Sequence, residues 1–210
     1  TLNFLEIIKK KKKIKFFNSS SSEIFKDTKN KLDENSSIYP SNPYGIAKAS
    51  SHFLIDAYRK KYNLFLVNGI FFNHSSFRTK NSFLLKYLAI QFKRLANNKV
   101  KKINLIDSRP IRDFGYAKDY VIYAYKLMQL RKADNFIIAT GKSKSVKQIV
   151  NIYLKFYNLS YKKINYINKE NSKNLNKYKI TNNKKILNTL KIKKIKTIKQ
   201  VIKKIINNET

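Results

Sequence analysis

The chain alternates between two spacings of its apolar residues. Short, nearly continuous apolar runs at 14–18 and 64–72 are typical of strands, and the second is dense enough to be buried on both faces of a sheet. Residues 43–62 repeat apolar positions at the spacing of a helix, and Pro43 suits a helix start, where its missing N–H costs little. The same patterns predict further helices at 1–8, 82–95, 117–130, 146–157, 182–190 and 195–206, and further strands at 100–106, 136–139 and 161–167.

Strands that alternate with helices predict an α/β fold with a largely parallel sheet and flanking helices. Ser145 is the expected N-cap of the helix at 146–157. The polar segments 25–38 and 73–81 are expected to be loops. Segment 168–179 is polar and short of large apolar residues, a composition typical of mobile segments.

The formal net charge of +34 raises the possibility of a basic module that binds a polyanion. The excess is mostly lysine, whereas arginine is the usual reader of guanine edges. Asn, Ile, Tyr and Phe are also abundant, while the chain has 4 Gly, 3 Pro and no Trp. Residues with A/T-rich codons are therefore enriched, which favours genomic base composition as the cause and makes nucleic acid an unlikely partner.

Zero cysteines exclude disulfides, thiolate nucleophiles and cysteine-based zinc sites. The two histidines, His52 and His74, are too few for a histidine-rich metal site, so no metal is expected. No run of eighteen or more apolar residues indicates a membrane span, and the first residues do not resemble a signal peptide. These features predict a cytoplasmic protein.

Candidate chemistry is concentrated between residues 18 and 48. A run of four serines is closed by Glu23, and Tyr44 and Lys48 lie four residues apart, on one face of the predicted helix. An ammonium favours the phenolate form of a nearby tyrosine, so this pair could accept a proton. The alternative is structural: the Tyr44 ring packs, and Lys48 is a solvated helix lysine.

The serines and Glu23 after a strand, followed by Tyr-Pro-x-x-Pro-Tyr-x-x-x-Lys, resemble the extended short-chain dehydrogenase/reductases, and among them the GDP-mannose 4,6-dehydratase family. Further matching motifs follow in order at 68–74, 112–121, 137–141 and 145–146. The resemblance covers nearly the whole chain and weakens after about residue 158. It implies that residues 1–158 are the C-terminal part of a NAD(P)-binding Rossmann-like domain with interleaved substrate-binding segments. Residues 159–210 would be an eroded C-terminal substrate-binding portion.

The resemblance also implies catalytic roles. Tyr44 would deprotonate the C4 hydroxyl of GDP-mannose, and Lys48 would hold the phenolate and the ribose of NADP. Glu23 would take the C5 proton, and the hydroxyl of Ser21 would bind the C4 oxygen. Because the register of the serine run is open by one residue, Ser20 and Ser22 remain alternatives to Ser21.

Binding roles follow from the same resemblance. His74 would lie near the cofactor, Asn73 would contact the substrate, and Arg112 would meet the nucleotide diphosphate. The arginine that the family places at the cofactor aligns with Thr79, which leaves Arg78 as a substitute. The structural alternative for Arg112 is an ion pair with Asp113 or Asp119.

The chain has no glycine-rich turn of the kind that cradles a dinucleotide pyrophosphate. The expected sheet is therefore an incomplete Rossmann-like one, with an exposed edge at which missing strands would pair. A homo-oligomer, or a partner that supplies the N-terminal cofactor half, is expected. Three alternatives stay open: another sugar-nucleotide dehydratase, an epimerase, or a non-catalytic remnant.

Overall fold

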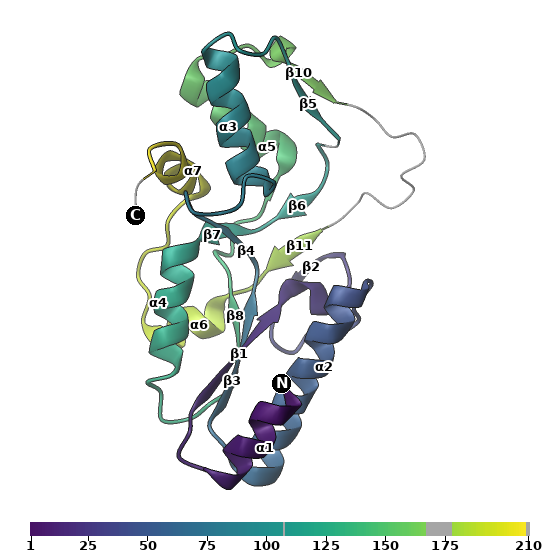
Figure 1. Ribbon diagram of the computed structural model, residues 1–210, viewed down its shortest axis with the longest axis vertical. Coiled ribbons are helices and arrows are strands. Elements are labelled where there is room, and N and C mark those ends of the chain that lie inside the picture. The colour runs from purple at the N-terminus through teal and green to yellow at the C-terminus, as the bar shows by residue number, and fades with distance from the viewer. Residues whose placement is uncertain (107, 167–177, 209–210) are drawn as a thin grey trace.

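A parallel sheet of three strands lies at the centre of the computed structural model, which describes residues 1–106, 108–166 and 178–208 (Figure 1). The strands are β1 (Phe16–Ser21), β3 (Leu66–Phe71) and β8 (Asn135–Ile138), in the order β1-β3-β8. Both pairings are parallel. The predicted α/β architecture with a largely parallel sheet is confirmed.

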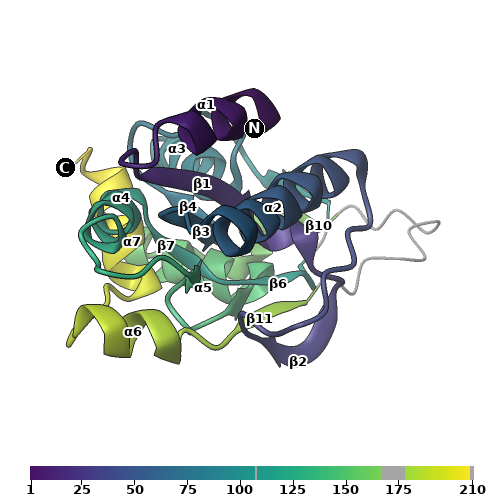
Figure 2. The ribbon, with the colours of Figure 1, turned by 90° about the horizontal axis from the view of Figure 1, so that it is seen from below.

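Helices cover both faces of this sheet (Figures 1 and 2). On one face lie α1 (Leu2–Lys10) and α2 (Pro43–Tyr62), which meet the strands through buried side chains such as Leu5, Ile55 and Leu66. The predicted helix at 43–62 has the bounds that the structure shows.

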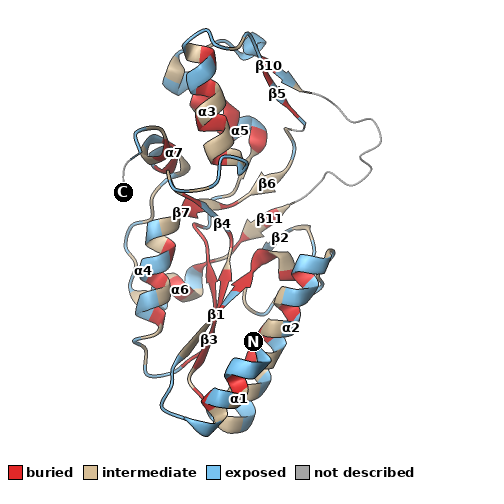
Figure 3. Ribbon diagram, in the orientation of Figure 1, coloured by how far each residue is buried: buried red, intermediate tan, exposed pale blue. Residues whose placement is uncertain are grey.

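The opposite face is covered by α4 (Ala117–Leu127) and α6 (Lys184–Leu190). Their apolar sides bury Tyr123 and Ile186 against Val67 of β3. Burial is concentrated on the strands and on the helix sides that face them, whereas the outer sides are exposed (Figure 3).

A second core joins three helices to a strand pair away from the sheet (Figure 1). It is built around Phe92 and Tyr153, whose rings stack with centroids 5.2 Å apart. Its elements are α3 (Leu84–Ala96), α5 (Val146–Tyr157), α7 (Ile198–Ile206), β5 (Ile103–Leu105) and β10 (Ile164–Tyr166). Ser145 caps α5 as predicted, in a capping box with Gln148.

Three short strand pairs lie between these two parts: β2 (Thr28–Leu32) with β11 (Lys179–Thr181), β4 (Asn73–Ser75) with β7 (Phe114–Tyr116), and β6 (Ile111–Arg112) with β9 (Lys144–Ser145). The predicted loops at 25–38 and 73–81 were therefore wrong in part, because each contains a strand. These strands are polar and pair with segments distant in sequence, so no local apolar pattern marks them.

The first strand also differs from its prediction at 14–18. It begins at Phe16 and continues through Ser21, with Ser21 opposite Phe71 of β3. The serines extend the strand because backbone pairing continues there and the hydroxyl of buried Ser20 has a hydrogen-bond partner in His52. Within the described residues, β1 pairs on one side only, so it forms an edge of the sheet.

The polar segment predicted at 168–179 lies mostly outside the described residues. Lys179, at its end, is 1% exposed and belongs to β11. Its ammonium donates to the backbone oxygen of Phe25 and lies 4.0 Å from the carboxylate of Asp27. This lysine is therefore a buried structural residue, although its segment has a composition typical of mobile segments.

Candidate active site

The start of α2 is held next to Glu23 by one asparagine. The side-chain oxygen of Asn42 caps the helix by accepting from Gly45 N at 2.8 Å, and its Nδ2 donates to Glu23 Oε2 at 3.1 Å. A Cβ on Gly45 would lie 2.4 Å from the backbone oxygen of Glu23, so only glycine permits this close approach. The helix start and the carboxylate thus form one unit.

Lys48 connects α2 to the end of β1. Its Nζ donates to the backbone oxygen of Ser19 at 2.8 Å and lies 5.6 Å from the centre of the Tyr44 ring. The Tyr44 side chain is 55% exposed, so it is accessible to a ligand. The two side chains thus lie near each other on α2, as their spacing of four residues predicts, and their catalytic role stays a prediction.

A cavity of about 580 Å³ opens at the carboxyl ends of β1 and β3. Five of the predicted site residues line it: Ser21, Glu23, Tyr44, Asn73 and His74. The other lining residues are Ser19, Ser20, Ser22, Phe71, Phe72, Thr79 and Phe83. A hydroxyl, a carboxylate, a phenol and an imidazole therefore face one space, which provides the groups that proton transfer requires.

The serines of the run have different partners. Ser20 Oγ lies 3.2 Å from Nδ1 of His52, whereas Ser21 Oγ accepts from the backbone N–H of Glu23 at 3.2 Å. Side chains alternate along a strand, so Ser19 and Ser21 leave β1 on the face opposite to Ser20. Ser20 has an imidazole partner and Ser21 does not, which supports Ser21 as the candidate ligand for a substrate oxygen.

His74 is oriented by the backbone and by rings. Its Nδ1 lies 2.9 Å from the carbonyl oxygen of Phe72, so Nδ1 carries the proton and Nε2 is left to accept. The imidazole lies 5.4 Å from the Phe71 ring and 5.3 Å from the Tyr120 ring, measured between centroids. Asn73 is exposed at the start of β4.

Arg78 is not brought to the cavity. It is exposed, and its guanidinium lies 5.2 Å from the Phe77 ring. Its neighbour Thr79 lines the cavity instead and accepts from the N–H of Ser76 at 2.9 Å. Thr79 thus lies at the cavity, in the position at which the family pattern has an arginine.

Arg112 is also outside the residues that line the cavity, at the end of β6. It lies 3.7 Å from Asp27, and burial lowers the pKa of its guanidinium. The ion pair that the sequence suggested, with Asp113 or Asp119, was wrong. Asp113 instead accepts from Thr140 and Thr181, and Asp119 accepts from Lys196 at 2.7 Å.

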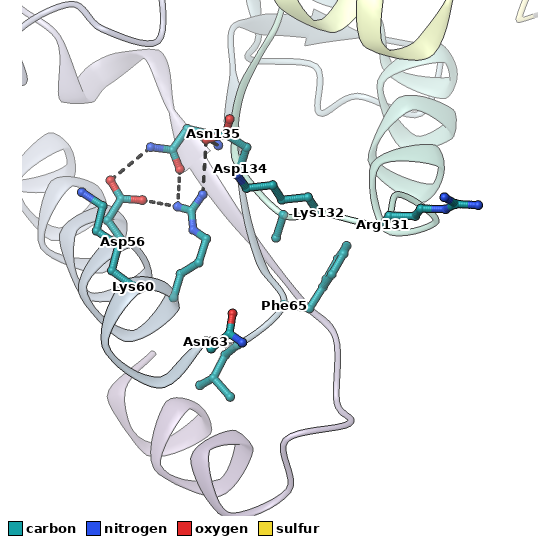
Figure 4. A pocket seen from close by; sticks show the side chains of 11 residues that line it. Asp56, Lys60, Asn63, Phe65, Arg131, Lys132, Asp134 and Asn135 are labelled. Carbon is teal, nitrogen blue, oxygen red and sulfur yellow. Dashed lines mark hydrogen bonds and ion pairs between the residues drawn. The ribbon is translucent and has the colours of Figure 1, made fainter.

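A second cavity, of about 620 Å³, lies at the opposite end of α2 (Figure 4). Several of its polar groups are paired with one another: Asp56 and Asn135 both bind the guanidinium of Arg59. Asn135 Nδ2 also donates to Asp56 Oδ2 at 3.1 Å. This cluster continues inward to His52, which is 2% exposed and whose pKa is lowered by burial.

Sequence reasoning missed three residues of this region. Asn42 was signalled only by its position before a helix-starting proline, and His52 only by its spacing of four from Lys48. The sequence indicated Thr79 only as the replacement of an arginine of the family pattern, and not as a residue that lines the cavity.

In the described part of the chain, no group of three or more His, Cys, Asp or Glu residues could hold a metal ion. Among the described helices, none is long and apolar enough to cross a bilayer.

Comparison with known sequences gives one consistent result. The family model for GDP-mannose 4,6 dehydratase matches residues 1–205. GDP-mannose 4,6 dehydratase 2 of Caenorhabditis elegans is 33% identical over 67% of this chain and 37% of its own length. The Vibrio cholerae GDP-mannose 4,6-dehydratase is 33% identical over 71% of this chain and 41% of its own length. The chain thus spans about two fifths of the length of these curated relatives.

Solved structures share the fold. A dTDP-glucose 4,6-dehydratase from Bacillus anthracis in complex with NAD superposes with a TM-score of 0.86 at 20% identity, over 98% of this chain and 64% of that one. RMD from Pseudomonas aeruginosa complexed with NADPH superposes with a TM-score of 0.87 at 18% identity, over 99% of this chain and 70% of that one.

Proposed function

The chain belongs to the GDP-mannose 4,6-dehydratase family, and from this premise we propose that it forms the substrate-converting part of such an enzyme. The reaction would turn GDP-mannose into GDP-4-keto-6-deoxymannose and water, with NADP as cofactor. The observation that carries the proposal is the meeting of Ser21, Glu23 and Tyr44 at one cavity, with Lys48 beside Tyr44. We also propose that residues 1–158 belong to a NAD(P)-binding domain and that residues 159–210 form a substrate-binding portion.

The residues present fit one end of a nicotinamide dinucleotide. Tyr44, Lys48 and His74 would hold the nicotinamide and its ribose, because Tyr44 and His74 line the cavity and Lys48 is fixed beside Tyr44. The nicotinamide, when bound, supplies a hydride acceptor that later returns the hydride. Solved relatives of this fold carry NAD or NADPH, and the family resemblance favours NADP.

The pyrophosphate end of the cofactor needs other residues. The four glycines, at 45, 69, 115 and 141, do not form a glycine-rich turn. We propose that a segment outside these residues, or a partner chain, supplies that turn and pairs with the free edge of β1. An unpaired strand edge is a ready template for such an addition.

The first step belongs to Tyr44. Its phenol oxygen would take the proton of the C4 hydroxyl while the C4–H hydrogen leaves as hydride to the nicotinamide, so that C4 becomes a ketone. Lys48, whose ammonium lies 5.6 Å from the centre of the Tyr44 ring, would face this oxygen as it reacts. The Ser21 hydroxyl binds the C4 oxygen.

The second step belongs to Glu23. The new ketone would acidify the C5 proton, which the carboxylate would take and pass to the C6 hydroxyl, so that this hydroxyl leaves as water. The hydride would then go back to C6, and Tyr44 would give the proton that it took from the C4 hydroxyl to C5, which gives the 4-keto-6-deoxy product. Asn42 keeps the carboxylate at the cavity by donating to Glu23 Oε2 at 3.1 Å.

The nucleotide would lie beyond the sugar. We propose Asn73 and Arg112 as contacts of the substrate, with Arg112 leaving Asp27 to meet the diphosphate, since a guanidinium fork suits phosphate oxygens. Arg78 could join the cofactor only after its exposed side chain turns toward the cavity. An epimerase eliminates no water, so an epimerase reaction would not need the carboxylate of Glu23 that Asn42 holds at the cavity.

The test is product analysis of the full native polypeptide together with any chain that copurifies with it. With GDP-mannose and NADP, we expect a product lighter by one water that retains the nucleotide. dTDP-glucose and UDP-glucose serve as matched substrates. Conversion of one of these in preference to GDP-mannose contradicts the substrate, and a product of unchanged mass with inverted stereochemistry contradicts the dehydratase.

A further inference from the structure

Four side chains of α2 form one polar row against the sheet. Tyr44, Lys48, His52 and Asp56 follow one another at intervals of four residues, so they share a face of the helix. Lys48 and His52 contact consecutive residues of β1, namely the oxygen of Ser19 and the hydroxyl of Ser20. The row therefore joins the candidate active site to the buried cluster at the other end of the helix.

The hydrogen bonds of this cluster determine the orientation of Asn135. Its Oδ1 accepts from the guanidinium of Arg59 and from Asn68 Nδ2 at 3.0 Å, so its Nδ2 must be the donor on the other side. That nitrogen donates to Asp56 Oδ2 at 3.1 Å and lies 3.4 Å from Nε2 of His52. The carboxylate oxygen Oδ2 of Asp56 lies 3.7 Å from Nε2 of His52, beyond hydrogen-bond length, so the nearer amide nitrogen of Asn135 is the partner and Nε2 accepts from it.

The tautomer of His52 follows from this arrangement. A neutral imidazole carries one proton, and with Nε2 accepting, the proton sits on Nδ1. Nδ1–H then donates to Ser20 Oγ, 3.2 Å away. Donation runs in one direction, from Arg59 through Asn135 and His52 to Ser20. A hydroxyl that accepts such a bond still has its own proton to donate, and Ser20 also lines the cavity.

We propose that His52 is a positioning residue of the candidate active site: it holds Ser20 as an acceptor, so that the Ser20 hydroxyl proton is donated into the cavity. This inference rests on the proposed function for its ligand, which would be an oxygen of the sugar.

A purely structural role for His52 makes a different prediction. Packing and stability would then depend on the ring, while the rate of the chemical step would not depend on which of its nitrogens is replaced. Asparagine and glutamine separate the two cases. The amide nitrogen of asparagine lies as many bonds from Cα as Nδ1 of histidine, and that of glutamine as many as Nε2.

The first measurement does not need activity. Ring nitrogen chemical shifts of the folded protein at neutral pH should show His52 as the Nδ1–H tautomer, with Ser20→Ala shifting the Nδ1 signal. His74 serves as the internal reference, assigned through His74→Gln. An Nε2–H tautomer, or a signal that Ser20→Ala leaves in place, overturns the proposal.

The second measurement is kinetic. His52→Gln loses the donor to Ser20 and should lower kcat about tenfold, the size of one lost hydrogen bond, with KM nearly unchanged. His52→Asn should keep most of kcat. Ser20→Ala should lower kcat to a similar extent, and the double variant Ser20→Ala with His52→Gln should be no slower than either single one.

The outcomes separate the two proposals. Equal kcat for His52→Asn and His52→Gln, or additive losses in the double variant, contradict the positioning role even if the protein is a dehydratase. An inactive native protein that nonetheless shows the Nδ1–H tautomer bound to Ser20 contradicts the dehydratase and leaves the contact to Ser20 in place. Unfolding midpoints of all variants identify losses that come from destabilisation.

Discussion

The ammonium of Lys48 lies 2.8 Å from the backbone oxygen of Ser19, so one lysine bridges α2 and the last residues of β1. The same ammonium lies 5.6 Å from the centre of the Tyr44 ring. Lys48 therefore has two features that experiment can separate: its charge lies beside the Tyr44 ring, and its hydrogen bond joins the helix to the serine-bearing strand.

Replacement of Lys48 by methionine removes both effects while keeping an unbranched chain. We expect oxidation at C4 to slow by about 10²–10⁴-fold, the range found for a lost proton-transfer group. Lys48→Arg should lose less, since the charge remains. The measurement is the rate at which reduced nicotinamide appears on mixing with substrate.

Lys60→Met is the matched control for that prediction. It changes the same residue type on the same helix, about 18 Å along the axis from Lys48 by the rise of an α-helix. The role of Lys48 in oxidation is supported if Lys60→Met oxidises the substrate at the native rate while Lys48→Met oxidises it slowly. Equal rates for the two variants argue against any role of Lys48 in the chemistry.

Replacement of Glu23 by glutamine should separate the two halves of the reaction. Because the base for the C5 proton is lost, water elimination should fall by about 10²–10⁴-fold while oxidation at C4 continues. Mass analysis of the sugar, together with deuterium uptake at C5, reports the two steps independently. Glu6→Gln, at a partly exposed ion pair with Lys9 on α1, is the control. An undiminished yield of dehydrated product with Glu23→Gln would remove this carboxylate from the mechanism.

Much of the fold was predictable because local pattern and tertiary position agree. Residues 43–62 form a helix with the predicted bounds because Pro43 opens it and its apolar face meets the sheet. Strand β3 was predictable because a dense apolar run, in which Asn68 is the one polar residue, is expected to be buried. The grouping of Tyr44, Lys48 and Glu23 was likewise expected, since their motif order implied it.

The remaining features depend on contacts that no local pattern encodes. Arg112 pairs with Asp27, far away in sequence, rather than with the aspartates that follow it closely. The strand at Thr28–Leu32 exists through its pairing with β11, and Lys179 is buried because that pairing brings it under Phe25. Contacts of this kind are set by the packing of distant segments.

Gly45 gives a test of the close approach between α2 and Glu23. Alanine normally stabilises a helix interior by about 1 kcal/mol relative to glycine. Here its Cβ would lie 2.4 Å from the oxygen of Glu23 and 3.1 Å from Pro40 Cβ, so we expect Gly45→Ala to destabilise the fold by about 1–3 kcal/mol instead, as overpacking does. Urea unfolding gives the free energy of unfolding.

Ala47→Gly is the control for Gly45→Ala, because Ala47 is exposed two residues further along the same helix. It should destabilise by about 1 kcal/mol through helix propensity alone. A stabilised Gly45→Ala variant would show that the start of α2 can move away from Glu23, and the rigid link between helix and carboxylate would then be wrong.

His52 should make the stability of the fold depend on pH. Burial lowers the pKa of His52 below its ordinary value, with Asp56 opposing and Arg59 adding to the shift. The strands packed against the ring present Ser20, Asn68 and Asn135, which do not titrate in this range. As pH falls below about 6.5, the unfolded chain binds a proton at this histidine before the folded chain does.

Stability should therefore be complete above that pH and decrease as pH falls toward the folded pKa, by at most about 1.4 kcal/mol per pH unit from this one group. The sign follows because the unfolded state binds more protons, so the free energy of unfolding rises with pH. His52→Asn should remove this component, and His74→Gln should not, so the difference between their urea-unfolding curves across pH isolates it. A wild-type curve parallel to that of His52→Asn would mean that the folded protein protonates His52 as readily as the unfolded chain does.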